Sequence, residues 1–164
     1  IQTKSMDTAL RTALRDCYCG DKYTGNKELS IPRIKLVLKQ FEEDLHRTVL
    51  KQGDRLLYAA KYLWYADMVS FRERGESITG ASYAKLPQGP QLNNYKDLVV
   101  FIIDADESQA EPLIPEEARI IQRVAMTFPL NRDVYHAAHK EIVWEEKSVG
   151  NLIPYTDANR LTQI

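Results

Sequence analysis

The chain has 164 residues, of which 44% are hydrophobic and 27% are charged, and its formal net charge is −1. This length suits one domain with a hydrophobic core, and the composition is that of an ordinary globular protein. Because Lys and Arg are interspersed with Asp and Glu, the charge argues against broad electrostatic attraction to nucleic acid or to an anionic membrane.

The number of cysteines and the apolar segments indicate in which cellular compartment the protein acts. The two cysteines, Cys17 and Cys19, are too few for a disulfide scaffold and favour a reducing cytoplasm. The most apolar stretch, residues 56–71, is interrupted by two charged residues and is a poor membrane span. No signal peptide is visible. The chain begins with Ile1 rather than Met, which leaves room for an upstream region.

The N-terminal part of the chain predicts an accessory segment. Residues 5–18 have the pattern of a short helix, and residues 20–28, rich in Gly, Asp, Lys and Asn, that of a loop or linker. We therefore divide the chain into residues 1–29, a helix and linker that could be the remnant of an upstream region, and residues 30–164, the main domain.

Two helices are predicted next. Ser30 can cap an amphipathic helix that has Pro32 in its first turn and ends at Gln52–Gly53. The following helix, which Asp54 can cap and which Gly75 ends, is apolar nearly all round. We expect it at the centre of the fold, packed on several sides.

The spacing of the apolar residues then changes from a helical pattern to an alternating one, which predicts a small β element. Residues 82–86 alternate as in a strand, and Pro87–Pro90 predict a rigid turn whose prolines cannot donate to a ladder. The short β-branched run Leu98–Ile103 is also predicted as a strand.

Helices dominate the rest of the chain. Pro115 opens a helix that ends before Pro129, Asn131 can cap a helix to about Lys140, and residues 155–161 predict a last short helix. The predicted fold class is mainly α (α+β), with five to six helices around a central apolar helix and a small β-hairpin or sheet.

No recognisable catalytic constellation is present. Cys17 and Cys19 with His136 and His139 could supply four zinc ligands, but neither pair has a zinc-finger spacing. No nucleophile elbow or phosphate-binding loop appears, and neighbouring acids such as Glu145–Glu146 point in different directions. We predict no enzyme activity, no cofactor and no metal site.

Aromatic residues are more informative. Tyr58, Tyr62, Trp64 and Tyr65 on one helix exceed what a core of this size needs, and a buried tyrosine must satisfy its hydroxyl. Tyr and Trp also dominate protein-interface hot spots. The pattern fits a binding surface and an ordinary core equally well.

The segment Tyr62–Pro90 combines several features in a fixed order. A tyrosine-rich helix reaches the step Ala66–Asp67, a Gly-x-x-Ile-Thr-Gly turn follows at Gly75–Gly80, and an alternating strand with Tyr83 leads to Gly89–Pro90. This order resembles the core signature of the Panacea, or SocA-like, antitoxin family.

A second element of the same family is matched near the C-terminus. His139 is followed five residues later by Trp144, with the acidic Glu141 between them. The chain departs from the family at Gln88, where an aromatic or similar residue is usual, and at Ile142–Val143, where Pro-Ala is favoured. These positions bear on partner choice more than on fold.

The resemblance covers roughly residues 31–160 and implies a mostly helical domain that neutralises a cognate toxin by binding it. It points to a cytoplasmic, prophage-associated toxin–antitoxin system. Some members of the family deliver the toxin to a protease, and others carry an added helix-turn-helix region and repress their own operon. We expect Pro87 and Pro90 to stiffen an edge that presents Tyr83. The residues predicted to share one partner-binding surface are Tyr65, Asp67, Tyr83, Gly89, Pro90, His139 and Trp144.

Two other functions stay open. A transcriptional regulator would need an upstream helix-turn-helix region, since the charge of this segment argues against direct contact with nucleic acid. A metal-dependent hydrolase would need the zinc ligands named above. We expect a protein partner and no membrane contact.

Overall fold

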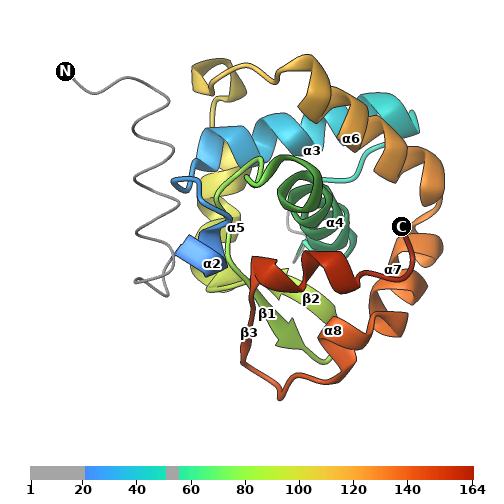
Figure 1. The fold of residues 1–164 in the computed structure, drawn as a ribbon. Helices are drawn as coiled ribbons and strands as arrows, with labels where there is room; N and C mark the ends of the chain where they lie inside the picture. Colours follow the sequence, from blue (N-terminus) through green and yellow to red (C-terminus); the bar gives the residue numbers. More distant parts are fainter. Residues whose placement is uncertain (1–20, 51–55) are drawn as a thin grey trace.

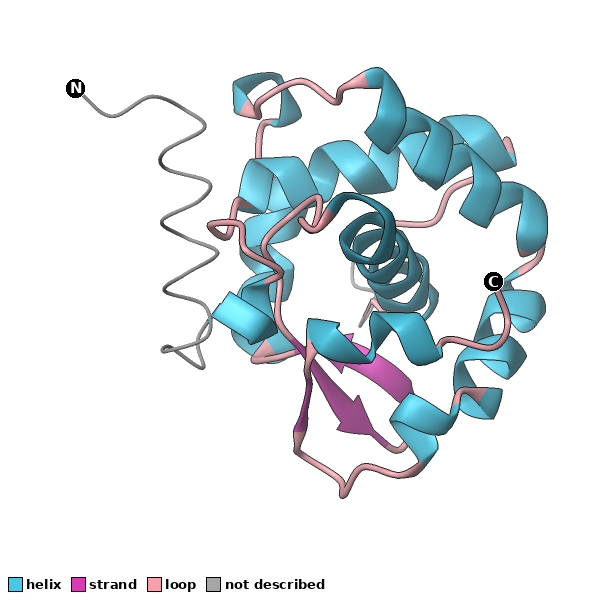
Figure 2. Ribbon diagram, in the orientation of Figure 1, coloured by secondary structure: helices cyan, strands magenta, loops and turns pink. Residues whose placement is uncertain are grey.

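The computed structural model describes residues 21–50 and 56–164. Its centre is α4 (Leu57–Arg74), which the other elements surround (Figure 1, Figure 2). Every residue of α4 from Ala59 to Ser70 is buried, as expected for a helix that is apolar nearly all round. Gly75 ends the helix with a φ of 75°. The mainly α fold around a central apolar helix is confirmed, whereas Asp54, its predicted cap, lies outside the described residues.

Helix α3 (Ile31–Leu45) packs against α4 and begins where the sequence predicts. The Oγ of Ser30 accepts a hydrogen bond from the backbone N–H of Arg33 at 3.2 Å, and Pro32 lies in the first turn. Its apolar stripe faces the core through Ile34, Val37, Leu38 and Phe41.

This helix is shorter than predicted. It ends at His46, which adopts a left-handed φ of 56°, and not at Gln52–Gly53, which lie outside the described residues. The carboxylate of Glu42 then accepts hydrogen bonds from the backbone N–H groups of Val49 (2.7 Å) and Leu50 (3.0 Å). Val49 is still buried, so the chain remains packed against the core beyond the end of the helix.

Helix α6 (Pro115–Thr127) confirms the predicted helix of this region. Glu117 in its first turn accepts a hydrogen bond from the N–H of Ile114 at 2.9 Å. The same buried carboxylate forms a two-pronged ion pair with the buried guanidinium of Arg33, with both N–O distances 2.7 Å. This pair fastens α6 to α3.

The C-terminal helices also follow the prediction, with one change at a cap. In α7 (Asn131–Lys140) the cap is Leu130 rather than Asn131, and its N–H donates to Asp133 at 3.0 Å. Helix α8 (Ile142–Glu145) follows directly. The predicted last helix is the 3-10 helix η2 (Tyr155–Arg160), and a further 3-10 helix, η1 (Glu107–Gln109), follows α5.

A small antiparallel sheet lies on one side of α4, with strand order β2-β1-β3. Its strands are β1 (Tyr83–Leu86), β2 (Gly89–Leu92) and β3 (Leu152–Ile153). Leu86 lies opposite Gly89, so the turn is Pro87–Gln88 alone. The predicted four-residue turn is therefore wrong in its second half, because Pro90 lies within β2, opposite Lys85. A proline is tolerated there because β2 is an edge strand.

The predicted strand at Leu98–Ile103 is wrong. These residues form most of the helix α5 (Tyr95–Asp104), which packs against α3. The Lys35 ammonium, on α3, donates to the carbonyl oxygens of Ile103 and Ala105 at the C-terminal end of α5. The preference of β-branched residues for strands is weak, and this tertiary contact with a helix end outweighs it.

The N-terminal linker is more ordered than predicted. Helix α2 (Asp21–Thr24) forms one turn within the expected loop 20–28. The backbone N–H of Ser77 then donates to the carbonyl oxygen of Gly25 at 2.8 Å, which joins this segment to the turn after α4. The predicted helix over residues 5–18 lies outside the described residues, and the division of the chain into two parts stays a prediction. Of the helices in the described ranges, none is long and apolar enough to cross a membrane.

Candidate partner-binding site

Asp67 fixes the turn that follows the central helix. Its carboxylate is fully buried and accepts four hydrogen bonds: from the N–H groups of Ile78 (2.8 Å) and Thr79 (3.0 Å), from the Thr79 hydroxyl (2.6 Å) and from the Tyr83 hydroxyl (2.6 Å). Burial raises the pKa of Asp67, and the hydrogen bonds oppose that rise. The aspartate thus ties α4, the turn and β1 into one unit.

Glu141 plays a similar part between α7 and the end of the chain. It is fully buried, and it accepts hydrogen bonds from the N–H groups of Thr162 (2.9 Å) and Gln163 (2.8 Å). The Tyr65 hydroxyl also donates to it at 3.3 Å. Burial, followed by the charge of Glu141, raises the pKa of Tyr65. The side chains of Tyr65 and Glu141 therefore stabilise the interior of the protein.

The tip of the β-hairpin is exposed and is held from α7 and α8. The Tyr135 hydroxyl donates to the side-chain oxygen of Gln88 at 2.7 Å. The indole N–H of Trp144 donates to the carbonyl oxygen of Leu86 at 3.2 Å, and His139 Nε2 lies 3.4 Å from the carbonyl oxygen of Pro87. Three side chains thus fix a two-residue turn.

The rings that hold the tip also contact one another. The centroid of the His139 ring lies 4.2 Å from that of Tyr135 and 4.7 Å from that of Trp144. Tyr58 meets Tyr135 edge-on at 6.2 Å, and the Lys85 ammonium lies 4.4 Å from the centre of the Trp144 ring. These rings are half-buried and border solvent. We call the following residues the hairpin face: Pro87, Gln88, Tyr135, His139 and Trp144.

Gly89 brings β2 into close contact with α4. Its φ is 114°, which side-chain-bearing residues rarely adopt. A Cβ atom at this position would lie 2.6 Å from Lys61 Cε and 3.2 Å from His139 Cε1. Glycine is therefore required for β2 to pass between Lys61 and His139.

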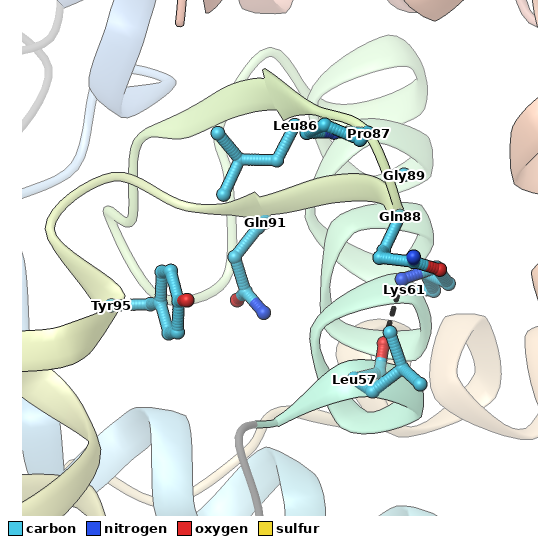
Figure 3. Close-up of a pocket in the computed structure, with 8 residues that line it drawn as sticks. All are labelled: Leu57, Lys61, Leu86, Pro87, Gln88, Gly89, Gln91 and Tyr95. Carbon is cyan, nitrogen blue, oxygen red and sulfur yellow. Dashed lines mark hydrogen bonds between the residues drawn. The ribbon is translucent and has the colours of Figure 1, made fainter.

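A pocket of about 550 Å³ opens between the hairpin and the first turns of α4 (Figure 3). Lys61 is buried beside it, and its ammonium donates to the carbonyl oxygen of Leu57 at 2.7 Å. Burial lowers the pKa of Lys61 to about 8. The residues that line the pocket are Leu57, Lys61, Leu86, Pro87, Gln88, Gly89, Gln91 and Tyr95.

Comparison with known families agrees with the pattern of the sequence. Residues 60–130 match the family described as "Antitoxin SocA-like, Panacea domain". The resemblance to the Panacea family is therefore confirmed over these residues. We call residues 60–130 the Panacea segment; it is somewhat less than half of the chain and contains most of α4, the β-hairpin, α5 and α6. Neither a curated protein nor a solved structure matches the chain.

The predicted site residues do not form one surface. Tyr65, Asp67 and Tyr83 are at most 1% exposed, and each uses its polar group inside the fold. The expectation that Tyr83 is presented from an edge is wrong for the same reason. Asp67 and Tyr83 hold the turn after α4 and the start of β1, and Tyr65 binds Glu141, so in this structure all three side chains stabilise the fold.

The other predicted residues do lie together. His139 and Trp144 belong to the hairpin face, and Gly89 and Pro90 are buried directly behind its tip. His139 and Trp144 lie beyond the Panacea segment, so the structure, and not the family match, brings them to the hairpin. Their role in partner binding stays a prediction.

Sequence reasoning missed Lys61 and Tyr135 as site residues. Lys61 is one of two charged residues in the apolar stretch 56–71, and this isolation was the available signal. The signal for Tyr135 was its aromatic type beside an irregular segment, but its contact with Gln88 spans 47 residues of sequence and could not be foreseen. Across residues 21–50 and 56–164 no cluster of three metal-ligating side chains occurs, and Cys17 and Cys19 fall outside those ranges.

Proposed function

We propose that this protein is an antitoxin that neutralises a cognate toxin by direct protein–protein binding through the hairpin face. The family match indicates a toxin–antitoxin role. The observation that supports binding at this place is the exposed tip Pro87–Gln88, held by half-buried aromatic side chains next to an open pocket. We further propose that the protein acts in the cytoplasm, without a catalytic step.

The chemistry of the hairpin face suits such a contact. Tyr and Trp contribute large contact areas with little loss of side-chain freedom, and they are enriched among interface hot spots. Because hydrogen bonds from Tyr135 and Trp144 already fix the tip, binding costs little further ordering. Gln88 occupies a position where this chain departs from the Panacea pattern, and we propose that it contributes to the choice of toxin.

The test is co-expression with the product of the neighbouring gene, followed by measurement of the affinity of the two purified proteins. We expect Gln88→Arg to weaken binding by at least about tenfold, because it places a bulky charge at the centre of the contact. The matched control is Gln122→Arg, the same change on the exposed surface of α6, on the opposite side of the molecule (Figure 1). The proposal fails if the wild type neither binds that product nor relieves its toxicity, or if both variants behave alike.

Binding also permits delivery of the toxin to a protease, which some members of the family perform. The half-life of the toxin, measured in cells with and without each cytoplasmic ATP-dependent protease, separates delivery from simple occlusion. In occlusion the toxin stays abundant and inactive, whereas in delivery it disappears only when the antitoxin and one protease are both present.

A further inference from the structure

We propose that the pocket beside Lys61 binds a carboxylate carried on an apolar group. That this carboxylate belongs to a segment of the toxin rests on the proposed function. The capacity of the pocket for such a group does not, and it can be measured without any toxin.

Lys61 is a buried cation without a counter-charge in the described chain. Its side chain is 1% exposed, and its ammonium donates to the carbonyl oxygen of Leu57 at 2.7 Å. The ring of Tyr135 lies 5.4 Å away and supplies weak cation–π attraction. An ammonium has three N–H donors, so one carbonyl oxygen does not satisfy it. Among residues 21–50 and 56–164, Lys61 forms no ion pair.

The position of Lys61 in α4 increases the need for an anion. Lys61 lies on the second turn of an 18-residue helix, near the positive end of the helix dipole, where a cation is disfavoured. Leu56, the residue at that end of α4, makes no side-chain capping hydrogen bond in the described part of the chain. Lysines and glutamates are almost never fully buried unless they are paired. An anion from outside the chain would both pair the buried charge and offset its unfavourable position at the positive end of the helix dipole.

The lining of the pocket selects the type of anion. Leu57, Leu86 and Pro87 supply apolar walls, Gln91 points down from β2 into the space, and Tyr95 lies at its left edge (Figure 3). A phosphate would call for several cations or for an arginine fork, and a single ammonium with apolar walls does not provide these. One negative charge on an apolar group matches both the ammonium and the walls. The volume of about 550 Å³ is that of a typical ligand site.

The experiment uses the full chain and three small probes, followed by NMR of the amide groups and of the Lys61 side chain. N-acetyl-leucine carries a carboxylate of the kind at a chain end, and N-acetylglutamate α-amide carries one of the kind on an acidic side chain. N-acetyl-leucine amide is the matched neutral control. We expect the acids to bind with a Kd that is roughly millimolar, as for other ligands of this size, and the amide to bind at least about tenfold more weakly. The acid that binds more tightly identifies the source of the carboxylate.

Two variants locate the charge that matters. Lys61→Met keeps the length of the side chain and should lower affinity for the acids by at least about tenfold. Lys96→Met removes the same charge from an exposed position on α5, beside the neighbouring hollow, and should leave the affinity unchanged within about twofold. If Lys61→Met does not fold, the wild type still decides: a bound carboxylate must raise the pKa of Lys61 above its value in the free protein.

Several results would overturn the proposal. Equal binding of the acids and the amide would show that the carboxylate is irrelevant, and unchanged binding by Lys61→Met would show that another group holds it. A pKa of Lys61 near its ordinary value in the free protein would reveal a counter-charge within the chain. Because no toxin is used, any of these results can occur while toxin neutralisation itself stands.

Discussion

Replacing Lys61 by Met should stabilise the protein at neutral pH, although it removes a hydrogen bond. Lys61 is buried on α4, and burial lowers its pKa from 10.5 to about 8. The folded state therefore disfavours the charged form, which the unfolded chain accommodates freely in water. A methionine of similar length avoids this cost and fills the same space.

The size and pH range of the effect follow from the shift in pKa. A pKa lowered from 10.5 to about 8, at ~1.4 kcal/mol per unit, corresponds to about 3 kcal/mol of lost stability while the lysine is protonated. Loss of the hydrogen bond to Leu57 offsets about 1 kcal/mol of the gain. The net expected gain for Lys61→Met at pH 7 is therefore about 2 kcal/mol.

The sign of the pH dependence is fixed by proton linkage. Between about pH 8 and pH 10.5 the unfolded chain binds more protons at Lys61 than the folded chain does, so the stability of the wild type rises with pH in this window. The advantage of Lys61→Met should shrink across this window and reverse near its upper end, where only the lost hydrogen bond remains and the variant should be about 1 kcal/mol less stable than the wild type. Below pH 8 the advantage is complete.

Urea unfolding of both proteins at several pH values between 6.5 and about 10.5 measures this difference. Titratable side chains that lie close to Lys61 from α7 include Tyr135 and His139, so the pair is repeated with His139→Gln in the background. The same pH window should persist there. A variant that is less stable than the wild type at pH 7, or a difference that does not change with pH, would refute the assignment of Lys61 as an uncompensated buried cation.

Three further predictions test the groups that hold the fold. Asp67→Ala should lower the free energy of unfolding by about 3–5 kcal/mol, since it strands buried donors, while Thr79→Val, which removes one of them, should cost roughly 1–2 kcal/mol by the same urea assay. Gly89→Ala should lower the melting temperature more than Gly150→Ala, because both have positive φ but a Cβ meets no atom within 4 Å at Gly150; equal shifts would contradict the close contact with α4. Glu141→Ala should speed amide hydrogen exchange at Thr162 and Gln163 by roughly tenfold or more, and unchanged protection there would show that Glu141 does not hold this segment.

The sequence predicted the helices whose patterns were local. Ser30 and Pro32 marked the start of α3, and the apolar residues on all sides of α4 marked it as central, because caps and burial patterns are read within one or two turns. The strand predicted at Leu98–Ile103 was wrong because the choice between helix and strand for a short β-branched run depends on what lies beside it. Here that neighbour is Lys35 of α3, more than sixty residues away in the chain.

The candidate site was predictable only in part. The family resemblance pointed to Asp67 and Tyr83, which the structure joins by a hydrogen bond. It could not show that this bond lies in the interior rather than on a contact surface. His139 and Trp144 were identified by the family resemblance, whereas their contacts with the hairpin tip depend on tertiary structure. Burial of polar groups is a property of the assembled fold, and the spacing of residues in one sequence does not report it.

The residues that set the register of the hairpin are different from the residues that its turn exposes. Its register is set from beneath, by Asp67 holding β1 and by the glycine at position 89, while Pro87 and Gln88 project beyond the residues that fold depends on. Substitutions at Pro87 and Gln88 should therefore cost less stability than substitutions at Gly89. If the hairpin face binds the toxin as proposed, the choice of partner can change at these two positions while the scaffold stays the same.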